Sequence, residues 1–187
     1  MLDGIPQDGV TLGDADAPAT VVEFADLQCP FCGEFARKAF PDVVDQRVRS
    51  GDIRYELRLI SFLGQDSKEA AQVAAAATLQ NKLFDFAETF YLNQGEENSG
   101  YVTPDFLQQV ADSTPGLDAD QAIADSTTAD AQAIDADNEA KAKAQGVNST
   151  PTFFLVADGK TTEMQLSDLT ADAFNQALDE ALGAGGG

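Results

Sequence analysis

The sequence contains no histidine, only two cysteines and few basic residues, and each scarcity excludes a class of function. Eleven Lys and Arg residues stand against 32 Asp and Glu residues, which gives a net charge of −21 over 187 residues. This charge repels phosphate groups, so we expect neither nucleic acid nor an anionic membrane surface as a partner. Without histidine, the two cysteines supply only half of the ligands of a zinc site. We therefore expect no metal and no cofactor.

Long apolar runs and internal repeats are also missing. No apolar stretch approaches the ~20 residues that a membrane-spanning helix needs. The start of the chain, MLDG, has neither the basic nor the apolar region of a signal peptide. A secreted protein produced without its leader would look the same. The acidic residues are scattered, which indicates a strongly solvated surface or, as a second hypothesis, adaptation to high salt.

The pattern of apolar residues predicts a mixed α/β order: strand, helix, strand, a long helical segment, two strands and a helix. A short edge strand is also expected within 9–13, and Pro41 should kink or split the first helix. Asp158-Gly159 predicts a two-residue hairpin turn. The predicted strands are 19–25, 53–60, 152–157 and 161–166, and the predicted helical segments are 31–48, 67–144 with a loop at 93–101, and 169–182. In strand 53–60 the alternation of residues predicts one wetter face, and Ser67 is the expected cap of the following helix.

Cys29 and Cys32 lie together as Cys29-Pro30-Phe31-Cys32, between the first predicted strand and the first predicted helix. A C-x-x-C at such a junction is typical of a thiol–disulfide redox site. Two alternatives remain open. A structural disulfide here would close a very small loop and remove little entropy from the unfolded chain. A metal site would need ligands from a second copy of the chain.

We expect Cys29 to cap the helix, with Pro30 at its first position. The sulfur would then face unpaired backbone N–H groups and the positive end of the helix dipole. Both favour the thiolate and lower the pKa of Cys29 below the free value of ~8.5. Cys32 lies one turn further along and should be more buried. Cys29 is therefore the expected nucleophile and Cys32 the resolving thiol.

Glu23 is an acidic residue in the middle of an otherwise apolar strand, six residues before Cys29. If both faces of that strand are covered, burial raises the pKa of the carboxyl. Such a group could exchange protons with Cys32 as the disulfide breaks and forms. An exposed or edge-facing acid is the alternative. Asp26 stands where the strand ends, so we expect a turn or cap role for it.

Three segments together resemble the DsbA-like branch of the thioredoxin superfamily: residues 22–32 (VEFADLQCPFC), 51–55 (GDIRY) and 146–154 (GVNSTPTFF). The resemblance extends from about Gly9 to Leu182. It implies an α/β thioredoxin fold with a helical insertion domain. The implied division is residues 1–66 for the N-terminal half with the C-x-x-C site, 67–145 for the helical insertion, 146–183 for the C-terminal half, and 184–187 for a flexible tail.

The resemblance also implies roles for residues outside the C-x-x-C pair. Pro151 should be cis and pack beside the disulfide, and Thr150 should offer backbone hydrogen bonds to an extended substrate peptide. Phe31 and Pro30 are the other expected substrate contacts. Glu23 should be the buried acid beneath the site.

The same resemblance implies work outside the cytoplasm, in the periplasm or cell envelope, on exported proteins with free thiols. A membrane quinone-linked partner would reoxidise the protein, and the leader or anchor would be absent from this chain. Related isomerases add a dimerisation domain that is not visible here, so we expect a monomer.

The chain departs from the best-known members of the branch at Phe31, where they carry a histidine that helps to stabilise the thiolate. We therefore predict a weaker oxidant than those proteins. A reductase or isomerase acting through the same two cysteines is the main alternative function. A non-enzymatic peptide-binding or chaperone module near Phe31 and Pro151 is a second. A glutathione transferase with a helical insert ranks lower, because such proteins usually lack C-x-x-C.

Overall fold

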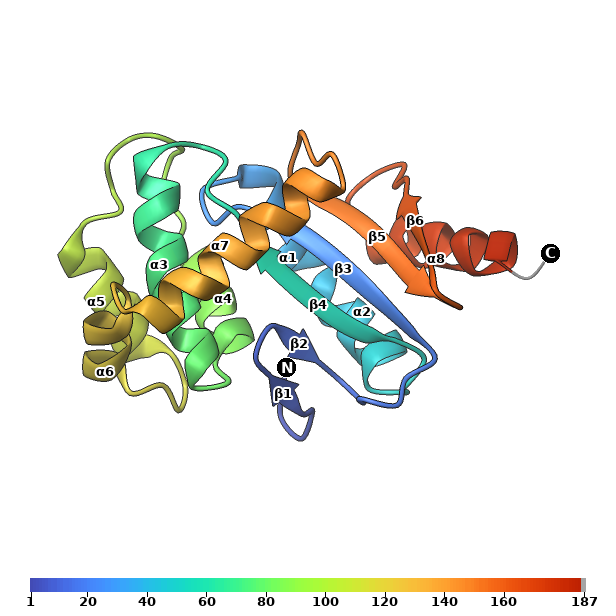
Figure 1. Cartoon of the computed structure of the whole chain (residues 1–187), viewed down its shortest axis with the longest axis horizontal. Coiled ribbons are helices and arrows are strands. Elements are labelled where there is room, and N and C mark those ends of the chain that lie inside the picture. Colours follow the sequence, from blue (N-terminus) through green and yellow to red (C-terminus); the bar gives the residue numbers. More distant parts are fainter. Residues whose placement is uncertain (186–187) are drawn as a thin grey trace.

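The computed structural model describes residues 1–185, and a six-stranded sheet lies at its centre, in the order β1-β2-β4-β3-β5-β6 (Figure 1). Strand β3 runs parallel to β4 and antiparallel to β5, so it is flanked by a partner on each side. The expected single edge strand within 9–13 is instead a short hairpin. The strands are β1 Gln7–Asp8, β2 Thr11–Leu12, β3 Ala19–Ala25, β4 Arg54–Leu59, β5 Thr152–Ala157 and β6 Lys160–Met164.

Helices cover the two faces of the sheet unequally (Figure 1). Their bounds are α1 Pro30–Lys38, α2 Phe40–Val43, a π-helical turn at Val44–Val48, α3 Gln65–Leu79, α4 Leu83–Leu92, α5 Pro104–Ser113, α6 Ala119–Asp125, α7 Ala129–Ala144 and α8 Ala171–Gly185. α1, α2 and α8 pack on one face, where Phe35 of α1 lies 4.8 Å from Phe153 of β5, between ring centroids. Helices α3 to α6 lie together beyond one end of the sheet, and α7 returns from them across the other face (Figure 1).

The break in the first predicted helix is confirmed. α1 ends at Lys38, Ala39 follows, and Pro41 stands in the first turn of α2. Proline has no N–H to donate to the preceding turn, so the helix cannot continue through it unchanged. The hairpin turn is confirmed too: Asp158 and Gly159 both have positive φ, 50° and 71°, as the tightest two-residue turns require.

The prediction of a wetter face on β4 is wrong at Arg58. Only 7% of its side chain is exposed, because α7 crosses this face. Its guanidinium contacts Glu56 on the same strand, lies 2.6 Å from a carboxylate oxygen of Asp137, and donates to Asn138 at 3.0 Å. The burial of a cation here is therefore compensated by charged and polar partners.

Two predicted boundaries also differ from the structure. Ser67 does not cap α3: the helix begins at Gln65 after Gly64, and the Ser67 hydroxyl is buried. Helix α8 continues to Gly185 and so includes the first two residues of the predicted tail 184–187. Residues 186–187 lie outside the described residues. The division into 1–66, 67–145 and 146–183 stays a prediction.

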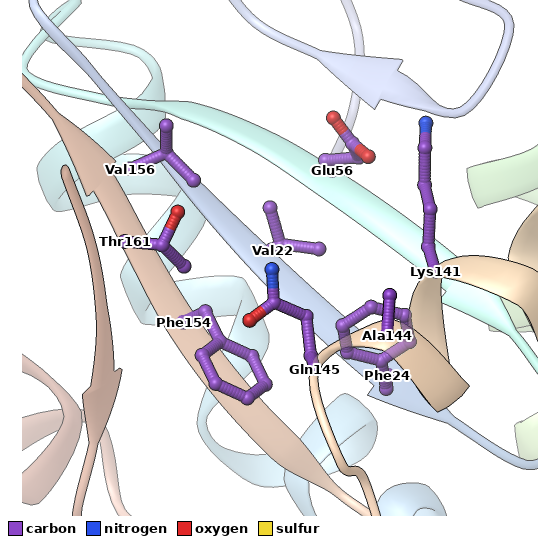
Figure 2. Close-up of a pocket in the computed structure, with 9 residues that line it drawn as sticks. All are labelled: Val22, Phe24, Glu56, Lys141, Ala144, Gln145, Phe154, Val156 and Thr161. Carbon is purple, nitrogen blue, oxygen red and sulfur yellow. The ribbon is translucent and has the colours of Figure 1, made fainter. Parts of the chain in front are cut away.

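A cavity of about 240 Å³ opens on the sheet face that α7 crosses (Figure 2). Val22, Phe24 and Phe154 line it from β3 and β5, and Gln145 lines it from just beyond α7. The Phe24 and Phe154 rings meet edge to face at 5.9 Å. None of the residues predicted for the redox site lines this cavity.

Candidate active site

The sequence around Cys29 folds as a strand, a tight turn and a helix. After β3 ends at Ala25, the N–H of Cys29 donates to the carbonyl of Asp26 at 3.0 Å. Cys29 then caps α1 with extended backbone angles, φ −64° and ψ 119°, and Pro30 takes the first helical position. The predicted position of Cys29 at the start of the helix is confirmed, although its side chain makes no cap hydrogen bond.

A distant loop completes the surroundings of the Cys29 sulfur. The thiol donates to the carbonyl of Thr150 at 3.3 Å, although the two residues are 121 positions apart. The Thr150–Pro151 peptide is cis, which confirms the geometry that the resemblance implied. Only 4% of the surface of Cys29 is exposed to solvent, and Thr150 and Pro151 are half-buried.

The pKa of Cys29 is lowered from 9.0 to about 6. The largest cause is the hydrogen bond from the Cys32 thiol. The side chain of Thr150 and the backbone N–H groups of Cys32 and Phe31 lower the pKa further, and burial opposes them. At neutral pH most of this thiol is therefore a thiolate, the form that attacks disulfides.

Cys32 has the opposite character. It is fully buried within α1, and burial, reinforced by the hydrogen bond and charge of Cys29, raises its pKa well above 9.0. Both cysteines are free thiols in this structure. The pair thus combines one activated sulfur with one that strongly prefers its proton.

Glu23 is buried, and the alternative of an exposed acid is wrong. It lies in the middle of β3, paired in register with Leu57 of β4 and Phe153 of β5. Only 6% of its surface is exposed, and one carboxyl oxygen accepts a hydrogen bond from the Tyr55 hydroxyl at 2.7 Å. Desolvation raises the pKa of Glu23 from 4.5 to about 7, against the lowering effect of Tyr55.

Asp26 does form the expected turn, since its carboxylate accepts from the Gln28 N–H at 2.8 Å. The sequence did not reveal that this carboxylate is fully buried or that it binds a second segment. It also accepts from the N–H groups of Phe62 and Leu63 at 2.7 and 2.9 Å, and from the Ser67 hydroxyl at 2.7 Å. Asp26 therefore ties the loop after β4 and the start of α3 to the turn before Cys29.

The surface next to Cys29 carries exposed apolar side chains. Phe31 is 60% exposed and Pro30 is also exposed, both in the first turn of α1. Phe62 is 49% exposed and belongs to the loop that Asp26 holds. Within residues 1–185, no group of three or more His, Cys, Asp or Glu residues is arranged to hold a metal ion.

Residues 6–180 match the model of a protein family described as Thioredoxin. The chain belongs to the thioredoxin family. Among curated relatives, disulfide bond formation protein D of Bacillus subtilis is 29% identical over 148 residues, which are 77% of this chain and 66% of that protein. The probable disulfide bond formation protein D of Bacillus cereus is 29% identical over 178 residues, 92% of this chain and 78% of that protein.

A solved structure shows the same fold. Oxidised BdbD from Bacillus subtilis superposes with a TM-score of 0.79 over 96% of this chain and 97% of that one, at 22% identity. The family, these relatives and the Cys29–Cys32 pair identify a DsbA-like thiol–disulfide oxidoreductase with a thioredoxin fold. In the part of the chain that the structure describes, no helix has both the length and the apolar character to cross a membrane.

Proposed function

We propose that the protein is a thiol oxidase, which introduces disulfides into exported proteins outside the cytoplasm. The contrast between the two thiols supports this direction more than any other observation. Cys29 is stabilised as a thiolate and Cys32 is stabilised as a protonated thiol. Stabilising the reduced pair makes the corresponding disulfide a better oxidant.

The reaction begins with the pair oxidised. A substrate thiolate attacks the Cys29 sulfur, the Cys29–Cys32 bond breaks, and Cys32 leaves as a thiolate in a mixed-disulfide intermediate. A second substrate thiolate then attacks the substrate sulfur of that intermediate and releases Cys29. The substrate gains a disulfide and loses two electrons, and the enzyme pair gains them.

Glu23 is the proposed proton donor to Cys32 in the first step. The charge of Glu23 is among the causes that raise the pKa of Cys32, so the two buried groups interact electrostatically. With a pKa of about 7, Glu23 is protonated in a large fraction of molecules near neutral pH. It can therefore neutralise the thiolate that leaves at a site where a charge is costly.

Four residues are the proposed contacts of the substrate. The loop of Thr150 and Pro151 lies against the Cys29 sulfur, so a peptide whose thiol reaches that sulfur passes beside this loop. Phe31 and Pro30 are exposed on the other side of Cys29 and would cover apolar side chains of the substrate. Unfolded exported proteins offer both extended backbone and exposed apolar residues.

The pKa of Cys29 sets the expected strength of the oxidant. Comparable thiols have pKa values of ~7 in thioredoxin and ~3.5 in DsbA, with potentials of ~−270 and ~−120 mV. A tenfold change in the stability of the reduced form is worth ~30 mV. A pKa of about 6 lies between these two pKa values, so we expect a potential between ~−270 and ~−120 mV. A measured potential near ~−120 mV would contradict the weaker oxidant that Phe31 predicts.

The moderate pKa of Cys29 also supports a second candidate, a reductase or isomerase acting through the same residues. A potential near the ~−270 mV of thioredoxin would favour it over the oxidase. We extend the oxidase proposal to a monomer in the periplasm or cell envelope that a membrane quinone-linked partner reoxidises. These extensions rest on the DsbA-like branch to which the chain belongs.

The deciding experiment follows disulfide formation in a reduced, unfolded ribonuclease. We expect the oxidised protein to restore ribonuclease activity, and Cys29→Ser to abolish this activity because no disulfide remains to be attacked. Cys32→Ser, the matched control, should trap a mixed disulfide through Cys29 when it is offered an activated substrate disulfide. Oxidation of ribonuclease by Cys29→Ser would overturn the proposed function.

A further inference from the structure

A glutamine that follows α4 contacts the first residue of the redox site. Gln94 is half-buried, and its amide nitrogen donates to the carbonyls of Leu27 and Cys29 at 2.8 and 3.0 Å. Its amide oxygen faces Arg37, whose Nη1 donates to it at 3.4 Å. The NH₂ group of the Gln94 amide thus faces two acceptors and the amide oxygen faces a donor, so the orientation of the amide is fixed.

Space for this contact depends on Gly33, which follows Cys32 inside α1. A Cβ at position 33 would lie 2.2 Å from the amide oxygen of Gln94 and 2.7 Å from Nη1 of Arg37. Glycine is among the least favourable residues in a helix interior. A side chain at position 33 would therefore displace the ends of Gln94 and Arg37 from their present positions.

The end of α4 holds the turn before Cys29 through a second residue as well. The Tyr91 hydroxyl donates to the Asp26 carbonyl at 3.2 Å, and the Tyr91 carbonyl accepts from Arg37 at 2.7 Å. Three carbonyls in the four-residue turn that leads from β3 to α1 thus receive hydrogen bonds from Tyr91 and Gln94. The turn is fixed from the helical side of the molecule and not only by the sheet.

We propose that Gln94 is a positioning residue of the redox site, which holds the backbone of Leu27 and Cys29 and thereby keeps the Cys29 sulfur in place between the first turn of α1 and the Thr150 carbonyl. The inference rests on the proposed role of Cys29 as the nucleophile. Gln94 touches neither sulfur in the bonds described, so it acts through the backbone.

The physical link is the directionality of hydrogen bonds. Backbone N–H groups of Phe31 and Cys32 contribute to the lowered pKa of Cys29. Such bonds weaken steeply as their angle departs from linearity. If the Cys29 carbonyl loses the Gln94 donor, the cap residue can rotate, and its sulfur then moves relative to the N–H groups of the first turn and to the Thr150 carbonyl. The thiolate is then less stable, although the fold is unchanged.

Gln94→Met tests this, because methionine has a similar length and no donor. We expect the pKa of Cys29 to rise by about half a unit, so that the thiolate fraction and the rate of alkylation by iodoacetamide near pH ~5 fall about threefold. Gln94→Glu should raise the pKa more, because a carboxylate cannot donate and faces two carbonyl oxygens. Thiolate absorbance measured across pH gives both values.

Gln121→Met and Gln121→Glu are the matched controls. Gln121 is exposed on α6, beyond one end of the sheet, so these variants change composition and net charge in the same way away from Cys29 (Figure 1). Both should titrate as the unchanged protein does. A Cys29 pKa that is the same in the unchanged protein, Gln94→Met and Gln94→Glu would overturn the inference, and so would an equal rise in the Gln121 variants.

Gly33→Ala provides a second test if the Gln94 variants fail to fold. Helix propensity alone predicts that alanine stabilises α1 and leaves the Cys29 thiolate unaffected. The proposed positioning predicts that the new Cβ displaces Gln94 and raises the pKa of Cys29, as Gln94→Met does. An unchanged pKa in a folded Gly33→Ala would contradict it. These titrations do not depend on substrate oxidation, so the inference and the proposed oxidase activity can fail separately.

Discussion

Glu23 and Asp26 are two carboxylates buried three positions apart, one in the middle of β3 and one in the turn after it, and their surroundings are opposite. Asp26 accepts four hydrogen bonds, three from backbone N–H groups and one from a hydroxyl. Glu23 accepts one, from Tyr55, and desolvation raises its pKa to about 7. Donors replace the lost water at Asp26 and largely fail to do so at Glu23. Burial with few hydrogen-bond donors, as at Glu23, is what allows a carboxyl to exchange a proton near neutral pH.

The largest effect should come from Asp26→Asn. An amide group offers one acceptor oxygen where the carboxylate offers two, and its NH₂ group faces the N–H groups of Phe62 and Leu63. We expect the free energy of unfolding to fall by about 3–4 kcal/mol, which urea denaturation measures. Asp66→Asn is the control, because Asp66 accepts a single bond, from the Gly100 N–H. An equal loss in the free energy of unfolding of both variants would show that the four hydrogen bonds of Asp26 stabilise the fold no more than the single bond of Asp66.

Glu23→Gln should have the next largest effect and act through pH. The folded pKa of Glu23 is raised, so its contribution to stability is complete below about pH 4.5 and is lost as the pH rises through about 7. Glutamine removes this loss and can still accept from Tyr55. We expect the variant to gain about 3 kcal/mol relative to the unchanged protein between acidic and alkaline pH.

Unfolding of the oxidised form by urea across pH would measure this gain without interference from the thiols. Glu180→Gln, at an exposed position of α8, should leave the pH dependence unchanged. If Glu23→Gln follows the same pH curve as the unchanged protein, Glu23 ionises freely in the folded state and the contrast with Asp26 disappears. The same variant should slow substrate oxidation, because Cys32 then leaves without its proposed proton donor.

The smallest effect should separate two tyrosines. Tyr55 donates to the Glu23 carboxyl and Tyr91 donates to the Asp26 carbonyl. Each change to phenylalanine should cost about 1 kcal/mol. The hydrogen bond from Tyr55 lowers the pKa of Glu23, so its removal in Tyr55→Phe should raise that pKa. The pH range over which stability is lost should therefore move upward in Tyr55→Phe and stay in place in Tyr91→Phe. Denaturation curves at several pH values distinguish the two variants, and a shift of this range in Tyr91→Phe would run against the comparison.

The elements that the sequence predicted well are those determined by neighbouring residues. The break at Pro41, the turn at Asp158-Gly159 and the cap at Cys29 each depend on a few adjacent positions. Arg58 was misjudged because the helix that covers it, α7, comes much later in the chain, and its partner Asp137 on that helix is 79 positions away. The alternation of apolar and polar residues within a strand does not indicate whether a helix from a distant part of the sequence covers one of its faces.

The candidate site divides in the same way. The C-x-x-C pair was visible because its two cysteines are only three positions apart in the sequence, and Glu23 because an acid stands out in an apolar strand. The hydrogen bonds of the Asp26 carboxylate span up to 41 positions, and those of Gln94 to Leu27 and Cys29 span 67 and 65. Asp26 gave a signal only for its turn, and Gln94 gave none, because glutamine is common on helix ends and loops.

The pairing of β3 with β5 has a consequence for the order of events during synthesis. Cys29 and Cys32 leave the ribosome more than a hundred residues before Thr150, which completes the surroundings of the Cys29 sulfur. Contacts of such large sequence separation form late, because a long loop must be closed first. A nascent chain therefore presents two adjacent thiols before it has a finished site. We expect the enzyme, early in its own synthesis, to resemble the reduced, unfolded chains that we propose as its substrates.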